Sequence, residues 1–179
     1  MDIFWYVLYA SKGKAVKLRP YLEAASIEYF FPFYYKDVKI GRSESYERTA
    51  LPLIGNLVFA RSSKDILDPV LKEAKLKLAV SSDLYYRDYG DKRIITVSEY
   101  QMRNFIAVVA NGLEKVTYLS NDEVPERGMK VKITGGTFAG VEGFFVRING
   151  NRCLVVSIPN FFSVATDYIP ACYVQQLES

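Results

Sequence analysis

The sequence predicts an α+β fold made of two parts that differ in texture. In residues 1–118, short apolar runs typical of strands alternate with segments that have the 3.6-residue periodicity of helices. Residues 119–126 are mostly polar and have the composition of a linker. From 127 to 179 every apolar segment has the pattern of a strand. We therefore expect a sheet flanked by helices, then a linker, then a small five-stranded β-barrel.

The first part opens with an apolar strand, Trp5–Tyr9, followed by a helical stretch that extends to about Ser26. Pro20 lies inside that stretch. Because proline lacks the amide hydrogen that a helix uses, it should kink the helix or delay its start. The aromatic run 29–35, which Pro32 interrupts, predicts the next strand.

The middle of the first part continues the alternation. A polar run, 36–48, predicts a flexible loop or a hairpin, and Leu57–Arg61 is a further apolar strand. Ile66–Lys77 has helical periodicity. The polar residues 62–65 could start this helix, or Pro69 could mark its first turn.

The first part ends with its clearest local signal. Two short strands, 84–89 and 93–97, flank a glycine-containing turn. Ser98 and Gln101 then have the spacing of a capping box, in which each side chain bonds a free backbone amide at the start of a helix. The helix should end at Asn111-Gly112. Its apolar residues at helical spacing are Met102, Phe105, Ile106 and Val109.

The second part contains alternating strands and one strong turn. Asn149-Gly150 begins the connection between two strands, and this pair readily adopts the positive φ angles of a type I′ hairpin turn. The expected five strands lie at 129–133, 143–148, 153–158, 168–169 and 173–174.

Composition excludes several classes of function. The chain has 179 residues and no histidine, which removes the commonest general base and zinc ligand, so we expect no enzyme, no metal and no cofactor. Cys153 and Cys172, the only cysteines, are too far apart for a CxxC motif, and we expect both to be reduced in a cytoplasmic protein. The apolar segment 1–10 is too short for a membrane span or a signal peptide.

Charge is unevenly distributed between the two parts. Residues 1–117 hold 18 Lys and Arg against 14 Asp and Glu, a net +4, whereas residues 118–179 hold 5 against 6, a net −1. The first part is therefore the better candidate for a nucleic-acid surface.

Three segments carry a family resemblance. Residues 128–143, Gly-Met-Lys-Val-Lys-Ile-Thr-Gly-Gly-Thr-Phe-Ala-Gly-Val-Glu-Gly, closely resemble the KOW motif. Trp5–Tyr9 with the following Lys12-Gly13, and Leu53–Phe59, are similar to segments of the N-terminal (NGN) domain of NusG-type transcription elongation factors. The resemblance implies an NGN domain with an antiparallel sheet at 1–118, a linker at 119–126 and an SH3-like KOW barrel at 127–179.

Within that family, the length, the short linker and the Trp5 opening most resemble the specialised RfaH and UpxY-type paralogues. The resemblance implies a protein that binds RNA polymerase, reduces pausing and opposes termination on long operons, such as capsular polysaccharide operons. It implies no catalysis.

The resemblance also implies three sets of contacts. The clamp helices of the largest polymerase subunit would lie against an apolar depression, the non-template DNA strand would meet lysines beyond the first strand, and ribosomal protein S10 or the termination factor Rho would bind the loop after the barrel's fourth strand. The respective residues are Tyr9, Ile54, Leu57, Met102 and Phe105; Lys12, Lys14 and Lys17; and Ile158, Phe161 and Phe162.

Each contact has a plainer alternative. The five apolar residues could be ordinary core, since a helix of this kind must bury one face, and the lysines could be a solvated basic face. A different class of function, an RNA-binding or ribosome-associated KOW protein that never touches polymerase, would need its basic surface on the barrel, where the net charge is −1.

Overall fold

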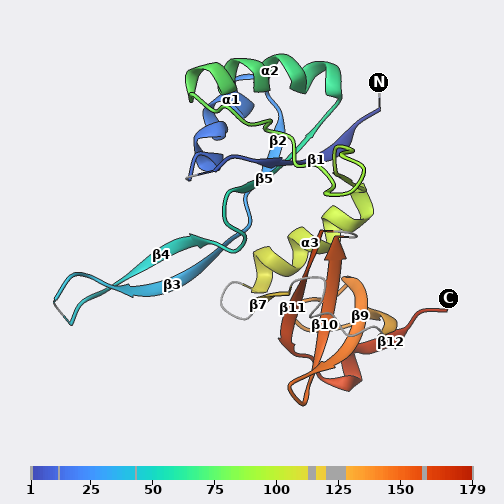
Figure 1. Cartoon of the computed structure of the whole chain (residues 1–179). Coiled ribbons are helices and arrows are strands. Elements are labelled where there is room, and N and C mark those ends of the chain that lie inside the picture. The colour runs from blue at the N-terminus through green and yellow to red at the C-terminus, as the bar shows by residue number, and fades with distance from the viewer. Residues whose placement is uncertain are drawn as a thin grey trace. The chain divides into compact units, whose positions relative to one another are not determined.

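The chain folds into two compact units, each built from two separate segments. The computed structural model describes residues 2–11, 13–42, 44–112, 116–119, 128–158 and 161–178. Unit 1 comprises Met1–Pro32 and Ile54–Glu99, and unit 2 comprises Phe33–Leu53 and Tyr100–Ser179. Within the described residues both units combine helices with antiparallel sheet, so the predicted α+β class is confirmed. Figure 1 shows the elements of both units.

Unit 1 is built on a four-stranded antiparallel sheet. The strands are β1 (Phe4–Tyr9), β2 (Glu28–Phe30), β5 (Leu57–Ser62) and β6 (Thr96–Val97), in the order β2-β5-β1-β6. β1 and β5 pair along their whole length, from Phe4 opposite Ser62 to Tyr9 opposite Leu57. Four consecutive residues of β1, Trp5 to Leu8, are buried. Because successive side chains point to opposite faces, both faces of β1 are covered.

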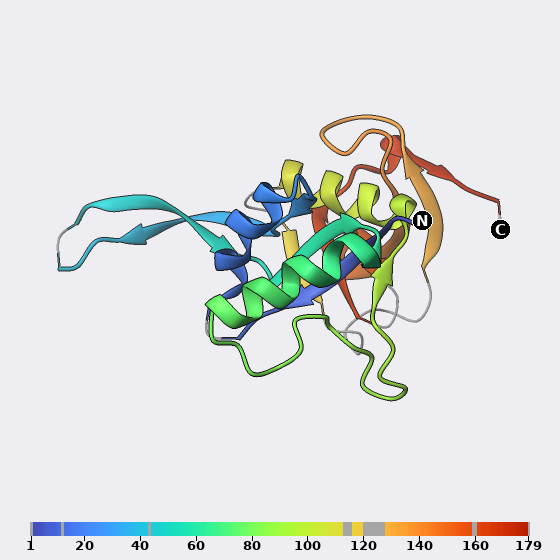
Figure 2. The same ribbon diagram turned by 90° about the horizontal axis from the view of Figure 1, so that it is seen from above.

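Two helices lie on one face of this sheet, α1 (Arg19–Ala24) and α2 (Lys64–Lys77), as Figures 1 and 2 show from two directions. A 3₁₀ turn, η1 (Ala15–Leu18), precedes α1, and Pro20 lies in the first turn of α1. The proline thus delays the α-helix, one of the two expected outcomes, because the first turn has no use for its missing amide hydrogen.

α2 starts earlier than Pro69 would mark. Ser63 occupies the N-cap position with an extended backbone, and Pro69 lies inside the helix. The alternative in which Pro69 forms the first turn is therefore wrong. The proline costs the helix one internal hydrogen bond, which the burial of Leu67, Leu71 and Ala74 on one helix face offsets.

Unit 2 contains a six-stranded antiparallel sheet, one strand more than expected. The strands are β7 (Val116–Leu119), β8 (Met129–Ile133), β9 (Glu142–Ile148), β10 (Asn151–Ile158), β11 (Phe162–Tyr168) and β12 (Val174–Gln176), in the order β12-β8-β9-β10-β11-β7. The additional strand is β7, which pairs with β11. A 3₁₀ turn, η3 (Ala171–Tyr173), precedes β12.

Two local details of this sheet bear on the predictions. Asn149 and Gly150 have φ angles of 49° and 85°, so the predicted type I′ connection between β9 and β10 is confirmed. The strand expected at 168–169 is longer and starts earlier, since β11 comprises Phe162–Tyr168. The loop at 158–162, which was expected to follow the barrel's fourth strand, therefore joins β10 to β11, which are the third and fourth of the strands β8–β12. The sequence pattern understated β11 because adjacent aromatic residues at its start suggested a loop.

Unit 2 also contains helix α3 (Glu99–Gly112) beyond its first residue and the hairpin β3 (Phe33–Lys39) and β4 (Tyr46–Pro52). α3 begins directly after Ser98, where the capping box predicts it. The two hairpin strands pair with each other as a separate two-stranded sheet, so the hairpin alternative for 36–48 is confirmed.

The proposed division at 118 and 127 differs from the two compact units, because α3 and β7 belong with the strands β8–β12. Of the expected linker 119–126, Leu119 is the buried last residue of β7, and 120–126 lie outside the described residues.

Candidate functional site

Three of the five apolar residues expected to contact polymerase lie in unit 1. Tyr9 and Leu57 are register partners at the end of β1 and the start of β5. The Tyr9 ring is half-buried and meets the Tyr86 ring edge-on, with 6.2 Å between centroids. Ile54, three residues before β5, is also half-buried, whereas Leu57 is 6% exposed. Tyr9 and Ile54 therefore offer partly accessible apolar surface, whereas Leu57 is buried.

The other two, Met102 and Phe105, lie on α3 in unit 2, and both side chains are 0% exposed. The Phe105 ring lies edge-on against the Phe162 ring of β11, with 5.3 Å between centroids and 72° between planes. Met102 and Phe105 are therefore core residues in this structure, which is the plainer alternative to a polymerase contact.

Phe105 belongs to a group of four rings that we call the ring cluster: Phe105, Tyr118, Phe161 and Phe162. Phe162 is its centre, with Phe161 at 4.8 Å and Tyr118 at 5.7 Å between centroids, and it is 1% exposed. Edge-on aromatic pairs contribute about 0.5–1.5 kcal/mol each beyond the area they bury. The cluster thus fastens α3 and β7 to β11.

The ring cluster unites residues that the sequence assigned to different partners. Phe105 was expected at the polymerase, and Phe161 and Phe162 at S10 or Rho. Ile158, opposite Phe162 in the β10–β11 ladder, is 1% exposed, so Phe161, which is half-buried, is the one member of that set with accessible surface. Tyr118, 40% exposed, was not singled out from the sequence, because a lone tyrosine beside a polar stretch gives no signal of pairing.

A polar contact holds α3 to β9 as well. The buried Asn104 accepts a hydrogen bond from the backbone N–H of Glu142 at 3.0 Å, and the Tyr100 hydroxyl donates to the Glu142 carboxylate at 2.5 Å. Burial, followed by this hydrogen bond to a carboxylate, raises the pKa of Tyr100. This contact could not be predicted from the sequence, since a single asparagine in a helical pattern carries no signal of its partner.

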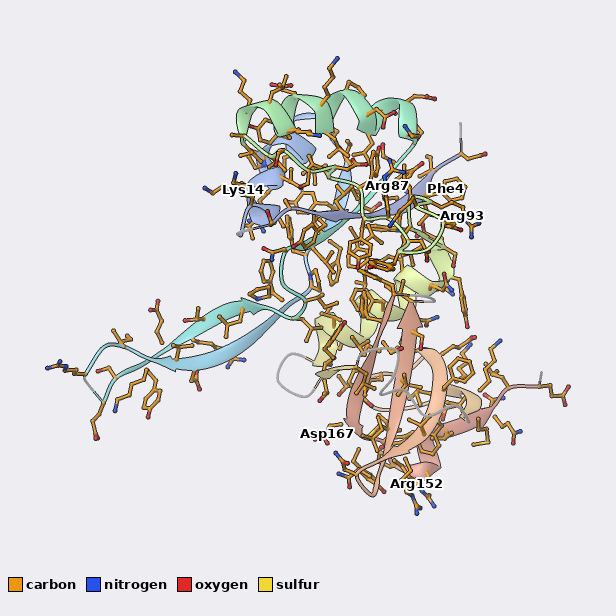
Figure 3. The ribbon with its side chains drawn as sticks, viewed as in Figure 1. Phe4, Lys14, Arg87, Arg93, Arg152 and Asp167 are labelled. Atoms are coloured by element: carbon orange, nitrogen blue, oxygen red, sulfur yellow. The ribbon has the colours of Figure 1, made fainter. Side chains whose placement is uncertain are left out.

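The three lysines expected at DNA have different positions. Lys14 donates from its ammonium to the backbone carbonyl oxygens of Leu78 at 2.8 Å and Ala79 at 3.1 Å, at the C-terminal end of α2 (Figure 3). A cation there stabilises the helix by satisfying carbonyls that have no partner within it. Lys17 in η1 is exposed, and Lys12 lies outside the described residues.

The described residues contain no group of three or more His, Cys, Asp or Glu side chains able to hold a metal ion. None of the helices among these described residues is both long enough and apolar enough to cross a membrane.

Of the comparisons with known proteins, the one with solved structures found a match. No protein-family model matches the chain, and neither does any curated protein. Among solved structures, the chain is similar to NusG of Thermotoga maritima, in work on domain interaction in that protein, with a TM-score of 0.48, 15% sequence identity and 99% of each chain covered. A structural neighbour is thus a NusG protein.

Proposed function

We propose that this protein is a NusG-type transcription elongation factor that binds RNA polymerase, reduces pausing and opposes termination. The specialised RfaH and UpxY-type role, on long operons such as capsular polysaccharide operons, is the form of this function that the sequence resemblance favours.

The observation that carries the proposal is the fit between the KOW-like motif 128–143 and its local structure. The alternating residues of the motif form β8. Gly136 and Gly140 have φ angles of +75° and +88°, a backbone conformation that residues with a side chain rarely adopt. Gly143 approaches β10 so closely that an added Cβ would lie 2.5 Å from the Val155 carbonyl oxygen. The glycines that define the motif are therefore those that the backbone requires.

The proposed polymerase contact starts from Tyr9 and Ile54, which are partly accessible, and includes the buried Leu57 next to Tyr9 in the β1–β5 pair. Met102 and Phe105 lie in unit 2 and are wholly buried, so they could contact polymerase only after their cover is removed; for Phe105 that cover includes Phe162. Separating Phe105 from Phe162 costs about 2–4 kcal/mol in lost burial and ring contact. The apolar surface of a polymerase helix would offset this cost by covering the same face.

For DNA we retain Lys17 and Lys12 and give Lys14 a structural role at the end of α2. Two phosphate contacts predict a log–log salt slope near −1.4 for single-stranded DNA, at about −0.7 per contact. For S10 or Rho, we retain Phe161, which is the accessible one of the three expected residues Ile158, Phe161 and Phe162.

The alternative, a KOW protein that binds RNA or the ribosome without polymerase, receives less support. Residues 118–179 carry 5 basic and 6 acidic side chains, which is a poor surface for phosphate backbones.

The test is a pull-down of bacterial RNA polymerase by the full chain, since a fragment ending at 118 would divide unit 2. Ile54→Asp should abolish capture, whereas the control Ile66→Asp, at a 49% exposed position on α2, should not. Phe162→Leu loosens the ring cluster and should increase capture if Phe105 is a contact. Circular dichroism confirms that each variant folds.

If the wild type captures no polymerase, the proposed function fails. If Ile54→Asp captures as much as wild type, the contact lies elsewhere on the chain. Where capture behaves as expected, read-through of a terminator on a long template tests the effect on termination.

A further inference from the structure

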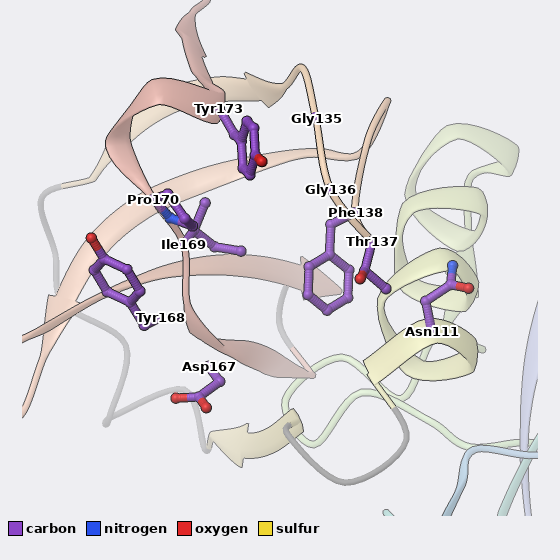
Figure 4. A pocket seen from close by; sticks show the side chains of 10 residues that line it. All are labelled: Asn111, Gly135, Gly136, Thr137, Phe138, Asp167, Tyr168, Ile169, Pro170 and Tyr173. Carbon is purple, nitrogen blue, oxygen red and sulfur yellow. The ribbon is translucent and has the colours of Figure 1, made fainter.

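Unit 2 contains a pocket of about 270 Å³ that has no part in the contacts described above (Figure 4). It lies between the β8–β9 connection, the end of β11 and the segment that leads into β12. The residues that define its chemistry are Gly135, Phe138, Asp167, Tyr168, Pro170 and Tyr173.

Aromatic rings form much of the pocket wall and are accessible to solvent. Tyr168 is 57% exposed and Tyr173 is 40% exposed, while Phe138 is half-buried on another side of the pocket. Rings left open in a concave site are available to a ligand, whereas rings in the core are already covered.

The part of the wall formed by Tyr173 is fixed before any ligand arrives. The Tyr173 ring packs on the backbone of Gly135, where an added Cβ would lie 2.6 Å from the ring. The Tyr173 carbonyl accepts a hydrogen bond from the Thr134 amide at 2.8 Å, and the Tyr173 amide donates to the Pro170 carbonyl at 3.0 Å. A preformed wall loses little conformational entropy on binding.

Charge selects the kind of ligand. Asp167 is exposed at the pocket and is acidic, and none of the ten described residues that line the pocket is a lysine or an arginine. Ring faces attract cations through their quadrupole, and a carboxylate attracts them by charge. Phosphate groups would be repelled by the same carboxylate.

We propose that this pocket binds the cationic side chain of an arginine or lysine in an extended segment of a protein partner. The tyrosine rings hold the cation by their faces, and Asp167 pairs with it at the rim. Thr137, also exposed at the pocket, offers a hydroxyl to the backbone of the segment. None of Ile158, Phe161 and Phe162 lines this pocket.

The test measures binding of a capped pentapeptide, Gly-Ser-Arg-Ser-Gly, to the full chain by amide chemical-shift changes. The control peptide carries citrulline, which has nearly the shape of arginine but no charge. We expect the arginine peptide to shift amides around Gly135 and Tyr173 and to bind at least tenfold more tightly than the citrulline peptide.

Two variants test the residues, each with a matched control elsewhere on the surface. Asp167→Asn and Tyr168→Leu should each weaken the arginine peptide roughly twofold to fivefold. Asp37→Asn and Tyr46→Leu, exposed positions on the β3–β4 hairpin with Tyr46 at 64%, should leave the affinity unchanged. Thermal unfolding checks that all four variants fold.

Three results would overturn the proposal. The first is equal binding of the arginine and citrulline peptides, or binding of neither. The second is unchanged affinity in both pocket variants. The third is displacement of the peptide from the pocket by an oligothymidylate, which would indicate a site where bases stack.

Discussion

Replacing Gly143 by alanine should destabilise unit 2 through a clash that can be located atom by atom. The new Cβ would lie 2.5 Å from the Val155 carbonyl oxygen and 3.1 Å from Cδ1 of Leu154. Ordinary contact begins near 3.4 Å, so the oxygen would have to retreat by 0.9 Å, the difference between 3.4 and 2.5. That oxygen is backbone of β10, the strand that pairs with both β9 and β11, and it cannot rotate away as a side chain would.

Overpacking of this kind costs about 1–3 kcal/mol, and we place Gly143→Ala near the upper end because backbone must move. Urea unfolding measures the loss. Gly140→Ala, with φ +88° and no atom within 4 Å, should cost only the strain of a left-handed backbone, about 1–2 kcal/mol. Gly55→Ala has neither a close atom nor a positive φ and should be neutral or stabilise by about 0.5 kcal/mol.

The urea midpoints of the three glycine variants test this reasoning against one another. If Gly143→Ala unfolds at the same urea concentration as Gly55→Ala, the close approach of β9 and β10 does not require glycine, and the structural support for the KOW-like motif is lost.

Three further predictions concern the ring cluster, pH and a helix end. In a double-mutant cycle by urea unfolding, Phe105→Leu and Phe162→Leu together should cost about 0.5–1.5 kcal/mol less than the sum of the two, and exact additivity would mean that the rings are not coupled. Burial of Tyr85, and next its hydrogen bond to the Asp68 carboxylate of α2, raises the pKa of the Tyr85 hydroxyl. Tyr85 therefore contributes fully to the unfolding free energy below about pH 10, the pKa of an unfolded tyrosine, and this contribution is lost as the pH rises above that value. Tyr85→Phe should therefore flatten the fall in stability between pH 9 and 11, and an unchanged slope would contradict this. Lys14→Met should cost about 1 kcal/mol by removing the cation at the end of α2, whereas the exposed Lys17→Met should leave the unfolding midpoint unchanged.

The parts of the fold that sequence predicts well are those that local chemistry decides. α3 begins directly after Ser98, as the capping-box pattern predicts, and such a signal depends only on residues of the same helix. The Asn149-Gly150 turn forms because those two residues tolerate positive φ. For α2, local signals left two possible start positions, because Pro69, which lies inside the helix, is also a residue typical of a first helical turn. The gain from burying one face of α2 is a tertiary effect that local preference does not contain.

The parts that sequence could not predict depend on partners far along the chain. β7 has only four residues and becomes a strand by pairing with β11, whose residues lie more than forty positions later. The periodicity of α3 correctly predicts a buried stripe, and yet it cannot say what covers Phe105. That cover is Phe162, which the sequence had assigned to a different surface.

The division of the chain has a consequence for the order in which the protein takes shape during synthesis. The ribosome releases the β3–β4 hairpin before any of 54–99, although the rest of the hairpin's own unit, 100–179, comes last. Unit 1 can close as soon as Glu99 emerges, whereas the six-stranded sheet of unit 2 must wait for residues still being translated. A nascent chain arrested just after Glu99 has left the ribosome should therefore protect β1 and β5 from proteolysis while the later segment of unit 2 is still incomplete.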